Sequence, residues 1–349
     1  MFYILIMVLA VLLVIPVRHK KDSGTAKLCY ILSFFISFLP AGLRYGIGTD
    51  YFYTYVPYFE WIGNGTKEYS EIGFNFLNKI IYNLTGDFRW LFFVTAFIIL
   101  FFIYKAIWDN SEDIPHSVLL IFIGQSYFYS MNMIRQAVAI AIILYSYKFI
   151  KEKKYIRVLW CILFAALFHT SALIFIPIFA LSILKISTLK KIILLVILTC
   201  FQPIFLKIVI LILKYTKYSW YYAEGLFMED ISILLVIQNI IILLLDIYYQ
   251  NRYHDKLTDE YKILSNINFF GICLMLLSYN IPLIYRLIRY CTIFQILFIP
   301  KIFNLSEKND NKKILSFLLY SFLFICMIYQ ILFCGGEGVF PYKSIFKEV

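Results

Sequence analysis

Long apolar stretches recur along the whole chain, separated by short polar or basic segments. They predict twelve transmembrane helices, at about residues 1–17, 28–43, 88–107, 115–131, 133–150, 157–169, 170–184, 190–213, 231–249, 263–282, 287–304 and 314–334. Three of these stretches are short for a bilayer, which takes about 20 residues to cross, so they could also be re-entrant or packed inside the bundle. The pattern indicates an all-α, polytopic integral membrane protein of 10–12 transmembrane helices.

The longest polar interruption is the segment 44–88, which follows the second apolar stretch. Its second half has apolar residues at positions 74, 77, 80 and 81, the spacing of one helix face. A helix of this kind would lie in the plane of the membrane interface. We expect 44–88 to form a large extracytoplasmic loop.

Composition excludes a soluble protein, because 62% of the residues are hydrophobic, only 15% are charged and the mean hydropathy is +0.80. A membrane β-barrel would instead show alternating segments of about ten residues. The seven cysteines are scattered singly through apolar segments, so the sequence indicates neither a disulfide framework nor a cysteine-based metal site.

The net charge of +11 is explained by membrane topology. Of the 32 Lys and Arg residues, 20 fall in the expected cytoplasmic loops, 11 fall outside, and Lys207 lies within a span. This bias follows the positive-inside rule and puts both termini outside. Because no soluble basic module is present, we expect no nucleic-acid partner.

Among the residues on the expected outer side, six form the candidate site: Arg44, Asp50, Arg135, His169, Arg286 and Arg289. Arg286 and Arg289 are three apart, so on a helix they share a face, which is unfavourable unless an anion lies between them. Arginine matches phosphate or carboxylate with paired donors. Together the residues predict an anionic, phosphate-bearing amphiphilic substrate approached from the outer leaflet.

Each of these residues also has a structural alternative. An arginine at the membrane edge can be a snorkelling anchor, His169 a packing residue and Asp50 a turn cap. Asp50 with Glu224, Glu229 or Asp230 could form a weak divalent site. The aromatic runs 51–55 and 220–222 could belong to interfacial belts or stack on sugar rings.

Four segments in this order resemble the EpsG family of Wzy-type polysaccharide polymerases: RYGIGTDY (44–51), IRQAVA (134–139), FHTSAL (168–173) and YRLIRY (285–290). The ending FPY (340–342) is also similar. The resemblance implies a single polymerase domain over 1–349 in the bacterial cytoplasmic membrane. It implies a membrane glycosyltransferase that joins oligosaccharide repeat units carried on undecaprenyl pyrophosphate, at the outer face, without ATP, a nucleotide sugar or another cofactor.

In that reaction we expect Arg44, Arg135, Arg286 and Arg289 to bind pyrophosphate. His169, or else Asp50, would act as the base. The lipid bilayer and the lipid-linked oligosaccharide are the expected partners, with a chain-length regulator as a further one. Two other functions stay open, a lipid-linked oligosaccharide flippase or transporter and an outer-face glycan ligase. The product could be capsule, O-antigen or exopolysaccharide.

Overall fold

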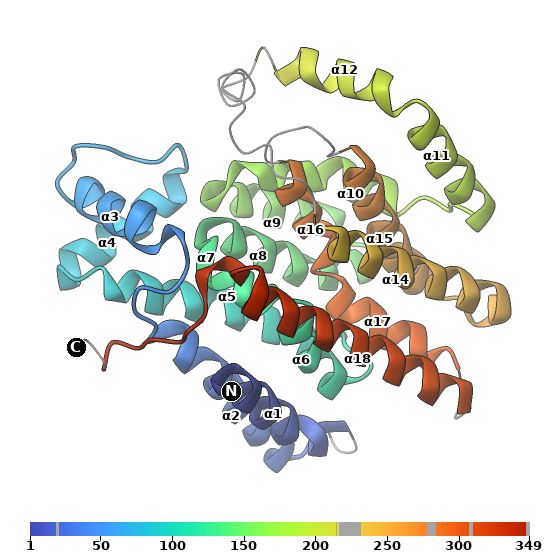
Figure 1. Ribbon diagram of the computed structural model, residues 1–349, viewed down its shortest axis with the longest axis horizontal. Helices are drawn as coiled ribbons and strands as arrows, with labels where there is room; N and C mark the ends of the chain where they lie inside the picture. The colour runs from blue at the N-terminus through green and yellow to red at the C-terminus, as the bar shows by residue number, and fades with distance from the viewer. Residues whose placement is uncertain (19–20, 214, 216–231, 278–283, 307–309, 347–349) are drawn as a thin grey trace. The chain divides into compact units, whose positions relative to one another are not determined.

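The computed structural model describes residues 1–18, 21–213, 215, 232–277, 284–306 and 310–346 (Figure 1). These residues are helical apart from turns and one isolated β-bridge, between Arg44 and Ser344. The chain divides into two compact units, residues 1–173 with 310–349 and residues 174–309. Each unit is described by itself. The expectation of one functional domain stays a prediction.

The first unit is a bundle built around α8. Its helices are α1 (Phe2–Val14), α2 (Gly24–Gly42), α3 (Val56–Gly63), α4 (Ile72–Thr85), α5 (Arg89–Asn110), α6 (Ile114–Ile123), α7 (Ser126–Asn132), α8 (Ile134–Lys151), α9 (Tyr155–Phe168) and α18 (Asp310–Phe333). Helix α8 packs against α5 and α9 and is buried on nearly all sides. Its small residues Ala137, Ala139 and Ala141 are all buried, which lets neighbouring helices approach closely.

The second unit is built around α15 (Asp259–Leu277). It also contains α10 (Phe175–Ser182), α11 (Thr188–Cys200), α12 (Gln202–Leu213), α14 (Ile233–Arg252), α16 (Arg289–Thr292) and α17 (Gln295–Asn304). The buried carboxylate of Asp246 in α14 accepts hydrogen bonds from Tyr261 (2.6 Å), Ser265 (2.5 Å) and Gln250 (2.8 Å). A buried charge of this kind is tolerated because every partner donates to it.

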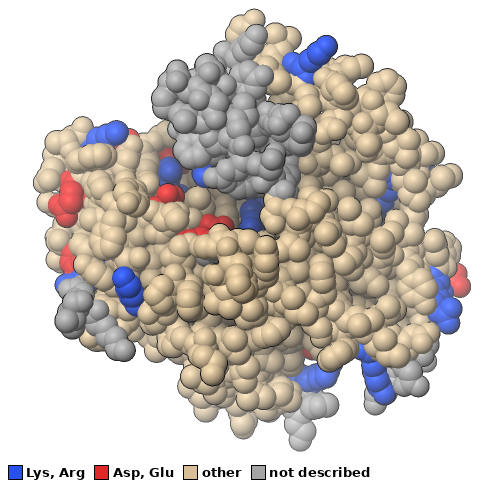
Figure 2. Space-filling model, viewed as in Figure 1, with Lys and Arg blue, Asp and Glu red and all other residues tan. Residues whose placement is uncertain are grey.

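Large apolar side chains cover much of the surface. On α2, residues Leu28, Ile31, Leu32, Phe35 and Leu39 are all exposed, at a spacing that keeps them on one side of the helix. Figure 2 shows that Lys, Arg, Asp and Glu take up only a small part of the visible face. An apolar surface of this extent needs lipid around it, and the protein is a membrane protein.

Among the described residues, six helices are long and apolar enough to cross a membrane, or seven if the bent pair α11 and α12 forms one span. The expected count of twelve is therefore not confirmed. Two expected spans are broken helices: 115–131 divides into α6 and α7 at Gln125, which has φ 66°, and 190–213 bends by 71° between α11 and α12. The expected short helices at 157–169 and 170–184 are present as α9 and as a 3-10 turn followed by α10.

The expected outer and inner segments of the first unit gather at opposite ends of its bundle. At one end the Tyr3 hydroxyl donates to the Val339 carbonyl at 2.7 Å. At the other end Arg18 pairs with Asp113, and Lys21 donates to the carbonyl of Trp108. The alternation of sides that the charge count predicts is thus consistent with how these helices pack.

Candidate functional site

The loop after α2 runs close to other parts of the first unit because two of its residues are glycines. Gly46 has φ 60° and Gly48 has φ 98°, backbone angles that favour glycine. A Cβ atom on Gly48 would lie 2.8 Å from the carbonyl oxygen of Met131, closer than real atoms approach. The Gly48 N–H donates to the carbonyl of Gly338 at 3.0 Å. The loop therefore lies directly against the end of α7 and the C-terminal segment.

Asn132, the last residue of α7, connects these segments through its side-chain amide. The amide oxygen accepts from the backbone N–H of Asp50 (3.0 Å) and from the hydroxyl of Thr49 (3.1 Å). The amide nitrogen donates to the Glu337 carboxylate at 2.7 Å. One side chain thus holds Asp50 and Glu337 on either side of the start of α8.

The C-terminal segment 337–345 is fixed along the same loop. The Tyr45 N–H donates to the Lys343 carbonyl at 3.1 Å, and the Ile345 N–H donates to the Leu43 carbonyl at 3.0 Å. The Tyr342 hydroxyl donates to the Pro40 carbonyl at 3.1 Å. The FPY ending is therefore a wall of the candidate site.

Arg135 lies in the first turn of α8, three residues beyond Asn132. Its Nη1 donates to the Glu71 carboxylate at 2.8 Å, and its guanidinium lies 4.1 Å from the centre of the Tyr69 ring. The Arg135 side chain is 22% exposed and that of Glu71 only 5%. The Nε atom of Arg135 has no hydrogen-bond partner among the described residues. The guanidinium is thus oriented by two neighbours and keeps an unused donor.

Tyrosines surround Arg135. Burial raises the pKa of Tyr55 to about 12, although the charge of Arg135 opposes that rise. Burial also raises the pKa of Tyr69, and the negative charge of Asp50 raises the pKa of both tyrosines further. Both phenols are therefore neutral at physiological pH, and Asp50 lies close enough to Arg135's neighbours to influence them.

Arg44 lies inside the protein, with 1% of its surface exposed. Its Nη1 donates to the carbonyl of Ala41 at the end of α2, and its guanidinium lies 4.9 Å from the Phe92 ring centre. Burial lowers the pKa of Arg44 to about 10, so it stays cationic at neutral pH. Its Nε and Nη2 atoms have no partners among the described residues. Direct contact with a ligand would require the loop to open.

His169 follows α9, where the backbone turns from helical to extended. Its Nδ1 lies 2.6 Å from the Ser171 hydroxyl oxygen, and its side chain is half-buried. Two residues earlier, Leu167 packs on Gly73 of α4, where an added Cβ would lie 2.8 Å from the Leu167 Cβ. Since Glu71 directly precedes α4, the structure brings His169 to the neighbourhood of the Glu71–Arg135 pair.

Helix α4 confirms the expected amphipathic helix, and two asparagines share the face that it buries. The predicted apolar positions were 74, 77, 80 and 81. The residues that are buried are Phe74, Asn75, Asn78 and Ile81, whereas Ile80 is 38% exposed. Asn75 bonds to the Tyr69 backbone through both of its amide atoms. The Asn78 amide nitrogen donates to the Phe74 carbonyl at 2.7 Å, whereas its amide oxygen has no partner among the described residues.

Arg286 and Arg289 belong to the second unit. Arg286 lies in a 3-10 turn (Ile284–Ile288) and Arg289 begins α16, so they are one turn apart, and both are half-buried. The neighbouring Ile288, Tyr290 and Cys291 are buried, and the turn and α16 both pack on α15. The structure therefore groups Arg44, Asp50, Arg135 and His169 in one unit and Arg286 with Arg289 in the other.

A divalent metal site is not supported within the part of the chain that the structure describes, where no group of three His, Cys, Asp or Glu residues could hold an ion. Glu224, Glu229 and Asp230 lie outside the described residues, as do the aromatic residues 220–222. The weak divalent site considered from sequence is thus untested.

Sequence reasoning missed three residues that organise the first unit's site, Glu71, Asn132 and Glu337. Arg135 and Glu71 are 64 residues apart in the sequence, and Asn132 and Glu337 are 205 residues apart, so no local sequence pattern predicts either pair. Of the three, only Asn132 could have been picked out from the sequence, because it is a polar residue just before an apolar helix and three positions before Arg135.

Comparison with known proteins agrees with the sequence resemblance. The model of the EpsG family matches residues 27–344, nearly the whole chain. Searches of curated proteins and of solved structures found no match.

Proposed function

The chain belongs to the EpsG family, and on that premise we propose that it polymerises oligosaccharide repeat units carried on undecaprenyl pyrophosphate. The family suggests a polysaccharide-biosynthesis enzyme of the polymerase type. In our proposal the reaction takes place at the extracytoplasmic face of the bacterial cytoplasmic membrane. The product is a surface polysaccharide.

The observation that carries this proposal is the environment of Arg135. Its guanidinium is held by Glu71 and Tyr69 at the first turn of a buried helix, with Nε unused. A helix N-terminus adds positive potential, and an arginine fixed in advance stabilises negative charge without reorganising. This environment suits the departure of a pyrophosphate, whose charge grows as its bond to the sugar breaks.

The chemistry is a glycosyl transfer. The hydroxyl oxygen of the incoming repeat unit bonds to the anomeric carbon of the growing chain, and the bond from that carbon to the pyrophosphate oxygen breaks. The lipid pyrophosphate leaves with the electron pair. A base takes the hydroxyl proton, and we assign this role to His169 first and Asp50 second.

The remaining arginines have different proposed roles. Arg286 and Arg289, one turn apart in the second unit, are proposed to bind pyrophosphate. Because Arg44 is buried against Ala41 and Phe92, its proposed contribution is to hold the glycine loop in shape, with ligand contact only when the loop opens. A chain-length regulator is the proposed protein partner.

A glycan profile of a deletion strain tests the proposal. Complementation with the unaltered chain should restore long polymer, whereas the strain alone should carry single repeat units at its surface. If repeat units instead accumulate on the cytoplasmic side of the membrane, the protein is a flippase. If long chains form but are not attached to their acceptor, it is a ligase.

A further inference from the structure

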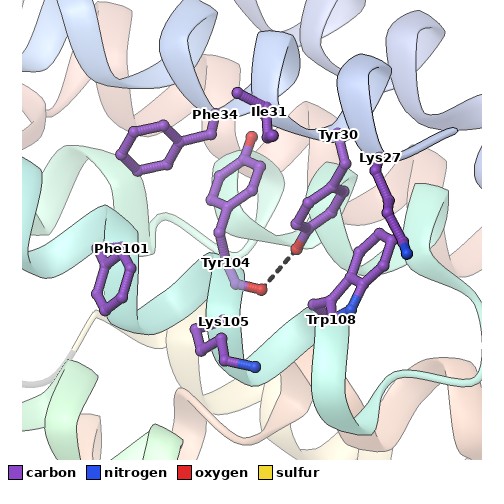
Figure 3. A pocket seen from close by; sticks show the side chains of 8 residues that line it. All are labelled: Lys27, Tyr30, Ile31, Phe34, Phe101, Tyr104, Lys105 and Trp108. Carbon is purple, nitrogen blue, oxygen red and sulfur yellow. Dashed lines mark hydrogen bonds between the residues drawn. The ribbon is translucent and has the colours of Figure 1, made fainter. Parts of the chain in front are cut away.

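A groove in the first unit lies between α2 and α5, toward the end of the bundle opposite the glycine loop. It encloses about 350 Å³ and is lined from α2 by Lys27, Tyr30, Ile31 and Phe34 and from α5 by Phe101, Tyr104, Lys105 and Trp108 (Figure 3). Both sets follow the spacing i, i+3, i+4 and i+7. Each helix therefore turns one continuous stripe toward the groove.

The walls of the groove are apolar although they contain tyrosines. The Tyr30 hydroxyl donates to the carbonyl of Tyr104 at 2.6 Å, as Figure 3 shows. The Tyr104 hydroxyl is bonded to Ser37 at 2.7 Å and to Ser33 at 3.1 Å. Both hydroxyls form hydrogen bonds within the protein, so a ligand in the groove would contact the aromatic rings. Such walls suit a hydrocarbon chain and offer little to a sugar.

Positive charge gathers at one end of the groove. The rings of Tyr30 and Trp108 are 4.8 Å apart, so the start of α2 lies beside the end of α5, and Lys27 and Lys105 reach the same end. The Lys21 ammonium lies 5.2 Å from the Trp108 ring centre. Asp109 is an acidic neighbour, and it is shared by Lys105 at 2.6 Å and Lys148 at 3.4 Å.

The groove opens onto surface that lipid must cover. Ile31 is 51% exposed and Phe101 is 46% exposed, and both belong to its walls. The charge distribution of the sequence assigns the end with Lys27 and Lys105 to the cytoplasmic side. Basic pockets between spans on that side are suited to anionic lipid headgroups.

From these features we infer that the groove binds a membrane phospholipid with an anionic headgroup, drawn from the cytoplasmic leaflet. One acyl chain lies along the rings, and the phosphate lies between Lys27 and Lys105. This inference is independent of the proposed polymerase reaction, because it uses neither the glycine loop nor the candidate catalytic residues.

Native mass spectrometry of the purified full-length protein tests the inference with three lipids. These are phosphatidylglycerol, phosphatidylcholine with the same acyl chains, and undecaprenyl phosphate. Phosphatidylglycerol should be retained in preference to phosphatidylcholine. One lysine near an anionic lipid is worth about 1 kcal/mol, so Lys27→Gln should weaken phosphatidylglycerol binding roughly five-fold. The matched control is Lys190→Gln, an exposed lysine outside the groove that the charge count also assigns to the cytoplasmic side, and it should change nothing.

A second variant, Ile31→Trp, should fill the groove and reduce retention of both phospholipids. Lys27 and Ile31 are both exposed, so neither change should prevent folding, and thermal unfolding checks this. Equal retention of the two phospholipids would overturn the inference, as would loss of binding in Lys190→Gln as large as in Lys27→Gln. Retention of undecaprenyl phosphate alone would overturn it in favour of a substrate-tail site.

Discussion

Replacing Arg135 with alanine, first alone and then together with Glu71→Gln, separates a structural role of its guanidinium from a role in binding substrate. The change leaves the Glu71 carboxylate, only 5% exposed, without its partner at 2.8 Å. Breaking a buried ion pair costs about 3–5 kcal/mol, and the lower end applies here because the Arg135 side chain is 22% exposed. We therefore expect Arg135→Ala to lose about 3 kcal/mol of stability.

A second substitution removes that cost. In Arg135→Ala/Glu71→Gln a neutral amide replaces the carboxylate, so most of the lost stability should return. Polymer should not return, because the proposed positive charge at the departing pyrophosphate is still missing. Losing one preorganised donor typically slows a reaction about 10²–10³-fold, which takes long polymer below what a gel detects.

The assay pairs two measurements on each variant. Thermal unfolding of the purified protein follows stability, and the glycan ladder of the complemented deletion strain follows polymer length at matched membrane abundance. Glu71→Gln alone serves as the control, since it keeps the arginine. Long polymer in the double variant would refute the reasoning, because Arg135 would then serve only to neutralise Glu71.

Four further substitutions test other parts of the site. Gly48→Ala should abolish polymer because the new Cβ atom would lie 2.8 Å from the Met131 carbonyl oxygen. The control is Gly65→Ala, which has the same backbone strain at φ 71° but open space around it, and this variant should still make polymer. Asn132→Ala removes three hydrogen bonds, so we expect short polymer and faster proteolysis of the C-terminal segment. The control Asn110→Ala loses one hydrogen bond to its own helix and should show neither change. His169→Gln should abolish polymer by removing the base, and Ser171→Ala should only reduce its amount; normal polymer in His169→Gln would transfer the role of base to Asp50. Arg18→Ala should leave the glycan ladder unchanged, because Arg18 is half-exposed and Asp113 keeps a second partner, His116, at 2.9 Å. Shorter polymer at normal membrane abundance would contradict the assignment of Arg18 to topology alone.

Features with a local cause were predictable from the sequence. The break at His169 was expected because two short apolar stretches meet there, and the chain does leave α9 at that residue. The family was also predictable, because each of its four motifs is a short continuous stretch and the four occur in this order.

Features that depend on distant partners were not predictable. The apolar pattern of α8 is the same for a helix that faces lipid and for one buried by α5 and α9, so hydropathy alone could not separate spanning from internal helices. The same ambiguity is why hydropathy alone cannot fix the number of spans. The burial of Asn75 and Asn78 on α4 was not predicted, because a periodicity argument follows the apolar residues alone.

The contact between the segment 337–345 and the glycine loop has a consequence for biosynthesis. The Tyr3 hydroxyl and the Val339 carbonyl that it meets are separated by 336 residues, and the loop likewise bonds to residues synthesised long after it. The first helices thus enter the membrane with one wall of the site missing, and the ribosome must translate past residue 345 before that wall can form. Nascent chains should accordingly be inactive in the proposed reaction until a late stage of translation.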